Sequence, residues 1–212
     1  MVWIVGVAAL SLLVCLPFYE YYKGTPKLAL ALAFKVIGTL CAASLVLVAA
    51  LKLDPRCWVL LIGMLLHTAG DVLLEIRFPI GLGLFLAGHI VYIAFFTNLF
   101  PVSVLHLVCF AVLAAVLGFL LWQWRKAVGK QMPLFIFYGL TLCAMSACAI
   151  AGGVSAHTSS GILIALGGAS FLVSDAVYLR RLLFPSPRWL HPLIMLTYFG
   201  AQLLLGAACL LL

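Results

Sequence analysis

Two aspartates lie inside long apolar stretches of the chain and are its first candidates for chemistry. Asp71 lies in the stretch from Cys57 to Ile76, and Asp175 lies in a similar stretch that starts at Gly167. An ionised carboxylate is strongly disfavoured in the hydrocarbon of a membrane, so such a residue faces protein or water. Two carboxylates that share a poorly solvated site do not both ionise readily. The pair is therefore typical of a general acid with a neighbouring base.

Polar residues one helical turn from Asp71 offer it partners. His67 precedes it by four residues and Glu75 follows it by four, which places all three on one face of a helix. The two neighbours could tune an acid/base centre, or they could form an interhelical hydrogen-bond cluster with Glu75 at the interface. The second aspartate is followed by Arg180 and Arg181. A salt-bridged structural carboxylate is therefore the alternative interpretation for that position.

A second set of polar side chains interrupts the other apolar stretches. Lys35 is the one cation well inside such a stretch. It could hold a phosphate or pair with an aspartate, and its aliphatic stem could extend toward the membrane surface. The other residues suit both ligand contact and interhelical hydrogen bonding. They are Tyr138, the pair His89 and Tyr92 in GHIVY, and the pair Tyr198 and Gln202 in YFGAQ.

The composition predicts a membrane protein. Hydrophobic residues make up 67% of the 212 residues and charged residues only 8%, far from an ordinary soluble domain. The apolar stretches are unbroken rather than alternating, which favours helices over a β-barrel. We therefore expect an all-α, polytopic membrane protein. The seven cysteines lack metal-ligand spacing and no HExxH, Walker or GxSxG motif is present, so no metal or cofactor is expected.

Prolines and glycines divide the chain into eight predicted transmembrane helices. Proline interrupts the helical hydrogen-bond ladder, and all nine prolines fall near predicted helix ends. The predicted spans cover residues 2–19, 27–50, 57–76, 81–99, 103–122, 133–152, 159–181 and 189–211. No linker is long enough to separate domains, so one membrane domain over residues 1–212 is expected. The first span has no basic leading segment or cleavage pattern and is not interpreted as a signal peptide.

The basic residues predict the orientation. Nine of the twelve Lys and Arg residues lie in the odd-numbered connections, which are cytoplasmic by the positive-inside rule. Both termini are then non-cytoplasmic, in a bacterial inner membrane or a eukaryotic endomembrane. With a rise of about 1.5 Å per residue, polar residues from six spans fall in one layer of the cytoplasmic half. Unrelated core residues would scatter through both leaflets, so the pattern favours a single site.

The spacing of the aspartates indicates an internal repeat. They are 104 residues apart (175 − 71), close to half the chain length. Gly63 precedes the first by eight residues and Gly167 precedes the second by eight. Halves of four spans each would share one orientation, as parallel repeats do. We therefore predict half-repeats at 1–104 and 105–212.

Four short motifs carry a family resemblance. They are GD at Gly70–Asp71, F-x-x-G-H-x-x-Y from Phe85 to Tyr92, F-x-x-S-D from Phe171 to Asp175, and T-Y-x-x-A-Q-x-L-L from Thr197 to Leu205. In their order and spacing the chain resembles the YhhN family, which includes the TMEM86 lysoplasmalogenases. Phe199 departs from the pattern, because many members have a second tyrosine there. The resemblance implies that Asp71 and Asp175 are the catalytic pair and that no metal is used.

The resemblance also implies a reaction. It is hydrolysis of the vinyl ether bond of an alkenyl lysophospholipid, which gives a fatty aldehyde and glycerophosphocholine or glycerophosphoethanolamine. A vinyl ether resists base but hydrolyses once its β-carbon is protonated. One aspartate would donate this proton, and the other would stabilise the cation and orient water. Lys35 would hold the phosphate or keep one carboxylate ionised, while His89, Tyr92, Tyr198 and Gln202 position substrate and water. The expected partners are this substrate and membrane lipids, with no nucleic acid and no obligate protein.

Two other functions use the same features. Intramembrane aspartyl proteases also carry two aspartates on separate spans, but this chain has TAGD where GxGD is expected and lacks a PAL motif. A proton-coupled transporter or lipid-binding protein could use the carboxylates to carry protons or to bind an amine headgroup. Transport would give pH-driven flux in liposomes without any product, whereas a hydrolase would release aldehyde in detergent.

Overall fold

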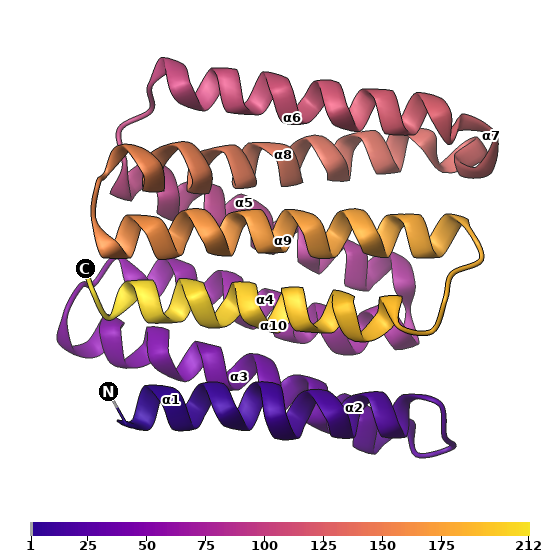
Figure 1. Cartoon of the computed structure of the whole chain (residues 1–212), viewed down its shortest axis with the longest axis horizontal. Helices are drawn as coiled ribbons and strands as arrows, with labels where there is room; N and C mark the ends of the chain where they lie inside the picture. The colour runs from indigo at the N-terminus through magenta and orange to yellow at the C-terminus, as the bar shows by residue number, and fades with distance from the viewer. Residues whose placement is uncertain (1) are drawn as a thin grey trace.

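The structure, a computed structural model, describes residues 2–212 as a bundle of helices (Figure 1). Eight helical runs are long and apolar enough to cross a membrane, which confirms the all-α, polytopic prediction. The first run comprises α1 (Val2–Ala9), a π-helical segment (Leu10–Cys15) and α2 (Leu16–Lys23). The others are α3 (Leu28–Lys52), α4 (Cys57–Ile76), α5 (Phe78–Leu99), α6 (Val104–Gln123), α8 (Met132–Ser155), α9 (Ser159–Leu183) and α10 (Leu190–Cys209).

The first run is longer than predicted and contains a proline. It continues to Lys23 rather than ending at residue 19, so Pro17 lies inside the helix and not near its end. Proline lacks the N–H that an α-helix needs and its ring crowds the preceding turn. The π-helical segment directly before it provides the wider turn. The hydroxyl of Ser11 within that segment donates a 3.1 Å hydrogen bond to the carbonyl of Gly38 in α3.

A tight connection joins α6 to α8. It contains the short helix α7 (Arg125–Val128) and one 3-10 turn (Gly129–Gln131), both before the start of α8 at Met132. Gly129 has a φ of 56°, a conformation that a residue without a side chain adopts easily. The connection lets α6 lie antiparallel on α8, at the edge of the bundle.

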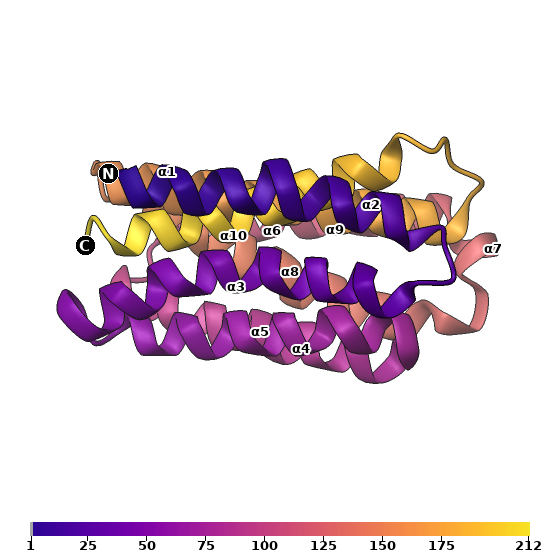
Figure 2. The same ribbon diagram turned by 90° about the horizontal axis from the view of Figure 1, so that it is seen from below.

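Six helices form a closed ring. Around the ring, α3, α4, α5, α8, α9 and α10 each pack on the next, and α10 packs back on α3. The first run lies outside against α3, and α6 lies outside against α8. Figure 2 shows α4 and α5 on one side of the bundle with α9 and α10 on the other. Both chain ends lie at the same end of the bundle (Figure 1), as an even number of spans requires.

Two helix pairs of the ring pack in matching ways. In α4, Gly63 faces the ring of Tyr92 and the carbonyl of Gly88 on α5. In α9, Gly167 faces Leu205 and a carbonyl of α10. At both positions the missing side chain lets two backbones approach closely, as is common where membrane helices pack. The duplication of residues 1–104 as 105–212 stays a prediction, and these contacts agree with it.

Candidate functional site

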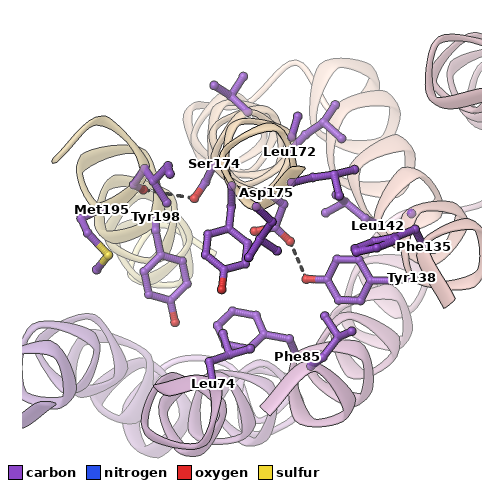
Figure 3. A pocket seen from close by; sticks show the side chains of 18 of the residues that line it. Leu74, Phe85, Phe135, Tyr138, Leu142, Leu172, Ser174, Asp175, Met195 and Tyr198 are labelled. Atoms are coloured by element: carbon purple, nitrogen blue, oxygen red, sulfur yellow. Dashed lines mark hydrogen bonds between the residues drawn. The ribbon is translucent and has the colours of Figure 1, made fainter. Parts of the chain in front are cut away.

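The helices enclose a cavity of about 300 Å³, and both aspartates line it. Its polar residues come mainly from α2, α3, α4, α8, α9 and α10. Much of its wall is apolar and is built by leucines, valines and phenylalanines of α5, α6, α8 and α9. Figure 3 shows Asp175, Tyr138 and Tyr198 pointing into the same space. The fold thus places two carboxyl groups in one cleft whose wall is mostly apolar.

Asp71 is held by a buried cation and two hydroxyl groups. Its Oδ2 accepts hydrogen bonds from Thr39 and Tyr198, each 2.9 Å long. The Nζ of Lys35 lies 3.1 Å from Oδ1, with 7% and 1% of the two side chains exposed. That contact is an ion pair without a well-aligned hydrogen bond to Oδ1. A carboxylate this deeply buried needs such compensation, and Lys35 and the hydroxyls supply it.

Asp175 has a different environment. Its Oδ2 accepts a 2.6 Å hydrogen bond from the hydroxyl of Tyr138, drawn in Figure 3. The Nε2 of His89 lies 3.4 Å from the same oxygen. Within residues 2–212, no lysine or arginine lies at ion-pair distance from this carboxyl group, and Arg180 instead donates to Ser186. The salt bridge that the sequence left open is therefore not formed.

A buried chain of polar groups extends behind Asp175. The hydroxyl of Tyr92 donates to Oε1 of Gln202 over 2.6 Å, and Nε2 of Gln202 lies 3.5 Å from Nδ1 of His67. The other ring nitrogen of His67 lies 2.9 Å from Nδ1 of His89. All four side chains are fully buried. They do not line the cavity and instead support its wall from behind.

The ten predicted site residues therefore separate into two groups. Six line the cavity: Lys35, Asp71, Glu75, Tyr138, Asp175 and Tyr198. The four members of the buried chain stand behind it: His67, His89, Tyr92 and Gln202. All ten come from the six helices of the ring. The sequence did not indicate which of these residues contact the cavity and which support its wall.

The predicted partners of Asp71 on its own helix bond elsewhere. His67 joins the buried chain, and Glu75 accepts hydrogen bonds from Lys23 and Tyr19 of α2. In the described part of the chain, no side-chain hydrogen bond connects Asp71 to either of them. The face of α4 that carries these three residues contacts different neighbouring helices along its length. Residues of α3 and α10 therefore take the place that the i, i±4 spacing suggested for His67 and Glu75.

A polar rim closes the end of the cavity where α2, α4 and α10 meet. Lys23 is its centre, because its Nζ lies 2.8 Å from both Glu75 Oε1 and the hydroxyl of Tyr19. The same nitrogen lies 2.7 Å from Nε2 of His191, whose Nδ1 lies 2.5 Å from Glu20. These five residues, hereafter the rim, carry two carboxylates and one ammonium group.

A known protein family matches most of this chain. The model of the YhhN family matches residues 30–209. The chain belongs to the YhhN family. No curated protein and no solved structure matches it. The matched range contains every predicted site residue, whereas the rim residues of α2 precede it.

One departure from the YhhN pattern has a structural explanation. Phe199, which stands where many YhhN members have a tyrosine, is fully buried. Its ring lies against Gly38 of α3, where an added side-chain carbon would come within 2.6 Å. The neighbouring Tyr198 alone points to the cavity and reaches Asp71. A Tyr-Tyr pair is thus not needed to bind this carboxylate.

Five residues around the YhhN site were not predicted from the sequence: Thr39 and the rim residues Tyr19, Glu20, Lys23 and His191. Thr39 lies one helical turn after Lys35, and this i, i+4 spacing was a usable signal. Tyr19, Lys23 and His191 lie near helix ends. Aromatic and basic residues are common there at membrane surfaces, so their types alone did not indicate a site.

Proposed function

We propose that this YhhN protein is a lysoplasmalogenase. It would hydrolyse the vinyl ether bond of an alkenyl lysophospholipid to a fatty aldehyde and glycerophosphocholine or glycerophosphoethanolamine. The observation that carries the proposal is the unequal environment of two carboxyl groups in one cavity. Asp71 faces the ammonium group of Lys35, whereas Asp175 faces only a phenol and an imidazole.

This inequality supports the following assignment of charges. The ion pair keeps Asp71 as a carboxylate, because a buried ammonium group without its partner is highly unfavourable. A second negative charge in the same dry cleft is disfavoured, so Asp175 holds a proton. The hydroxyl of Tyr138 occupies Oδ2 of Asp175. The proton then resides on Oδ1, the oxygen left for the cavity. In this proposal Asp175 is the acid and Asp71 is the anion.

The reaction follows from these charges. Asp175 transfers its proton to the β-carbon of the vinyl ether, and the double-bond electrons form the new C–H bond. The resulting oxocarbenium ion is stabilised by the carboxylate of Asp71. A water molecule adds to the cationic carbon and returns a proton to Asp175, which leaves a hemiacetal. The hemiacetal then breaks its C–O bond, with proton transfer to the leaving oxygen, and gives the aldehyde and the glycerol hydroxyl.

The shape of the site suits an amphiphilic substrate. Its apolar wall over α6, α8 and α9 can accept a hydrocarbon chain, while the rim around Lys23 can accept a charged headgroup. Of the two sequence-based roles for Lys35, the ion pair supports the one in which it keeps a carboxylate ionised. We place the rim at the cytoplasmic surface and both termini on the opposite side. The substrate would then enter from the inner leaflet.

The test compares three lysolipids that share chain length and headgroup. Purified protein in detergent should release aldehyde from the alkenyl lipid and leave the alkyl and acyl lipids intact. Asp71→Asn and Asp175→Asn should each lower the rate about 10³-fold, since each removes one half of the acid/anion pair. Asp54→Asn is the matched control, because Asp54 lies in the connection between α3 and α4 and bonds Arg56.

Three results would contradict the proposal. A folded Asp175→Asn protein that releases aldehyde at the wild-type rate would remove the acid. Cleavage of the acyl lipid alone would indicate a lipase. Proton-driven flux in sealed liposomes without any product would favour the transporter alternative.

A further inference from the structure

The hydrogen bonds of the buried chain behind Asp175 run in one donor-to-acceptor direction. The contact of His67 with a backbone carbonyl fixes that direction. The carbonyl of Phe85 can only accept a hydrogen bond, and it lies 3.3 Å from Nε2 of His67. This nitrogen therefore carries hydrogen. At the other ring nitrogen, the amide of Gln202 faces Nδ1, because the hydroxyl of Tyr92 occupies its oxygen. His67 is thus assigned, from its hydrogen bonds, as a neutral imidazole that accepts at Nδ1 and donates from Nε2.

The direction continues into the next imidazole. The same N–H of His67 is shared between the carbonyl of Phe85 and Nδ1 of His89, and the contact with Nδ1 is the shorter one at 2.9 Å. Nδ1 of His89 is then an acceptor and carries no hydrogen. A neutral imidazole has one N–H, and that of His89 must then be on Nε2. Nε2 lies 3.4 Å from Oδ2 of Asp175, close to it but without hydrogen-bond geometry, and it has no hydrogen-bond partner in residues 2–212. An unsatisfied N–H donor therefore lies beside the carboxyl group.

Aromatic packing keeps this imidazole in place. The ring of His89 lies edge-on to Phe171 with centroids 5.1 Å apart, and 5.5 Å from the ring of Tyr138. The ring of His67 lies 5.1 Å from the same Phe171. None of these rings offers an acceptor that would draw hydrogen to the other nitrogen, because the Tyr138 hydroxyl donates to Asp175. His67 alone determines which nitrogen of His89 carries hydrogen.

We propose that His67 is a positioning residue that keeps hydrogen on Nε2 of His89, the ring nitrogen that lies beside Asp175. The inference rests on the proposed function, in which Asp175 is the acid. An imidazole with a bare Nε2 would accept the carboxyl proton and compete with the substrate carbon for it. With hydrogen held on Nε2, His89 cannot accept the carboxyl proton, and the acidic proton stays on the cavity side. The reactive carbon is then the nearest acceptor.

The test reads the tautomer directly. The NMR spectrum of the whole protein with ¹⁵N-labelled histidine is recorded in detergent. The imidazole nitrogens are assigned by comparison with a His89→Gln sample. His89 should carry hydrogen on Nε2 only. In His67→Phe, a ring of similar size packs without donating, so His89 should lose this single tautomer. The kcat should then fall about tenfold, as for other partners that orient a histidine, with KM nearly unchanged.

Two variants control for packing. His67→Gln keeps a donor near the Nε2 position and should restore most of the kcat and the single His89 tautomer. Ser146→Ala removes a buried hydroxyl of α8 that has no hydrogen-bond partner in the described chain, and it should change neither reading. A wild-type His89 with hydrogen on Nδ1, or an unchanged kcat in His67→Phe, would overturn the inference. Because the spectra need no substrate, absent aldehyde release would instead show failure of the proposed function.

Discussion

The two aspartates occupy matching places in two helix pairs, yet their neighbours differ in charge. Asp71 of α4 faces Lys35 of α3, and Asp175 of α9 faces Tyr138 of α8. Lys35 and Tyr138 are 103 residues apart (138 − 35), nearly the spacing of the aspartates themselves. In the predicted half-repeats, the lysine therefore lies close to the position that corresponds to the tyrosine. One difference of charge can make an acid and an anion out of two similar carboxyl sites.

The residue before each aspartate fixes its helix in a different way. Gly70 faces the ring of Phe85 and the carbonyl of Gly81 so closely that an added carbon would lie within 3.3 Å of that oxygen. In the other half, Ser174 donates a 3.1 Å hydrogen bond to the carbonyl of Ile194. Close packing on one side and a hydrogen bond on the other perform the same task. The two halves thus share geometry more than they share chemistry.

Removing the positive charge of Lys35 should have the largest effect on the free energy of unfolding. Lys35→Met leaves Asp71 buried without its partner, which we expect to lower the free energy of unfolding by about 3–5 kcal/mol. Tyr138→Met at the matching place removes no charge and should lower it far less. Thermal unfolding of both variants in the same detergent measures the difference.

A double variant separates charge from packing. Lys35→Met combined with Asp71→Leu removes both charges, and it should recover most of the lost stability without recovering activity. If the single Lys35→Met protein were as stable as wild type, Asp71 would not be ionised in the fold. The assignment of acid and anion would then have to be reversed.

The close approach of α4 and α5 should be the next most sensitive feature. A side-chain carbon at Gly81 would lie 2.3 Å from the backbone nitrogen of Leu74, so Gly81→Ala must push the helices apart. We expect a loss of about 3 kcal/mol in unfolding free energy. Gly83→Ala, two residues away, meets nothing within 4 Å and should leave stability unchanged. Equal stability of the two variants would show that the helices are not packed this tightly.

The hydroxyls of Tyr198 and Tyr138 should make unequal contributions to stability, and the difference should be smaller than the effects above. Tyr198 donates to the ionised Asp71, and a hydrogen bond to a charged group contributes about 1.5–3 kcal/mol. Tyr138 donates to Asp175, which is protonated in our proposal, and a neutral bond contributes about 1 kcal/mol. Tyr198→Phe should therefore destabilise the protein more than Tyr138→Phe in chemical unfolding. The reverse order would place the negative charge on Asp175.

Much of the fold could be predicted from the sequence, because apolar length and composition decide which segments cross a membrane. The eight spans were found, and most ends were close to the structure. The first span was the exception, since Pro17 suggested an end that a π-helical segment makes unnecessary. The closed ring was not predictable, because apolar surfaces of membrane helices carry little information on which neighbour they meet.

The site was predictable as a set of residues but not as a set of contacts. Buried polar groups are rare in a membrane, so their positions alone selected Lys35, Asp71 and Asp175. Their partners depend on helix rotation, which the spacing of His67 and Glu75 on one face did not determine. The imidazoles of His67 and His89 are 22 residues apart in the sequence and lie on different helices, so they become neighbours only through the packing of α4 on α5. The direction of the buried chain could not be deduced from residue types.

The exposed ion pair between Asp54 and Arg56 should stabilise the fold less than the buried pair between Lys35 and Asp71. Side-chain hydrogen bonds from Arg56 lower the pKa of Asp54, in the connection between α3 and α4. A lowered folded-state pKa means that the stabilisation is present above the unfolded value, about 3.9, and is lost as the pH falls through the folded value. Arg56 is about half exposed, with 49% of its side chain accessible, so the pair should contribute less than about 1 kcal/mol.

Asp54→Asn should therefore lower the unfolding free energy slightly at pH 7, and the difference from wild type should vanish at acidic pH. High salt should also remove the difference, because exposed charges are screened, whereas the effect of Lys35→Met should persist in salt. Unfolding at low and high salt at both pH values measures this. A salt-sensitive Lys35 effect would mean that water reaches the Lys35–Asp71 pair, and the dry cleft on which the acid chemistry of Asp175 depends would not exist.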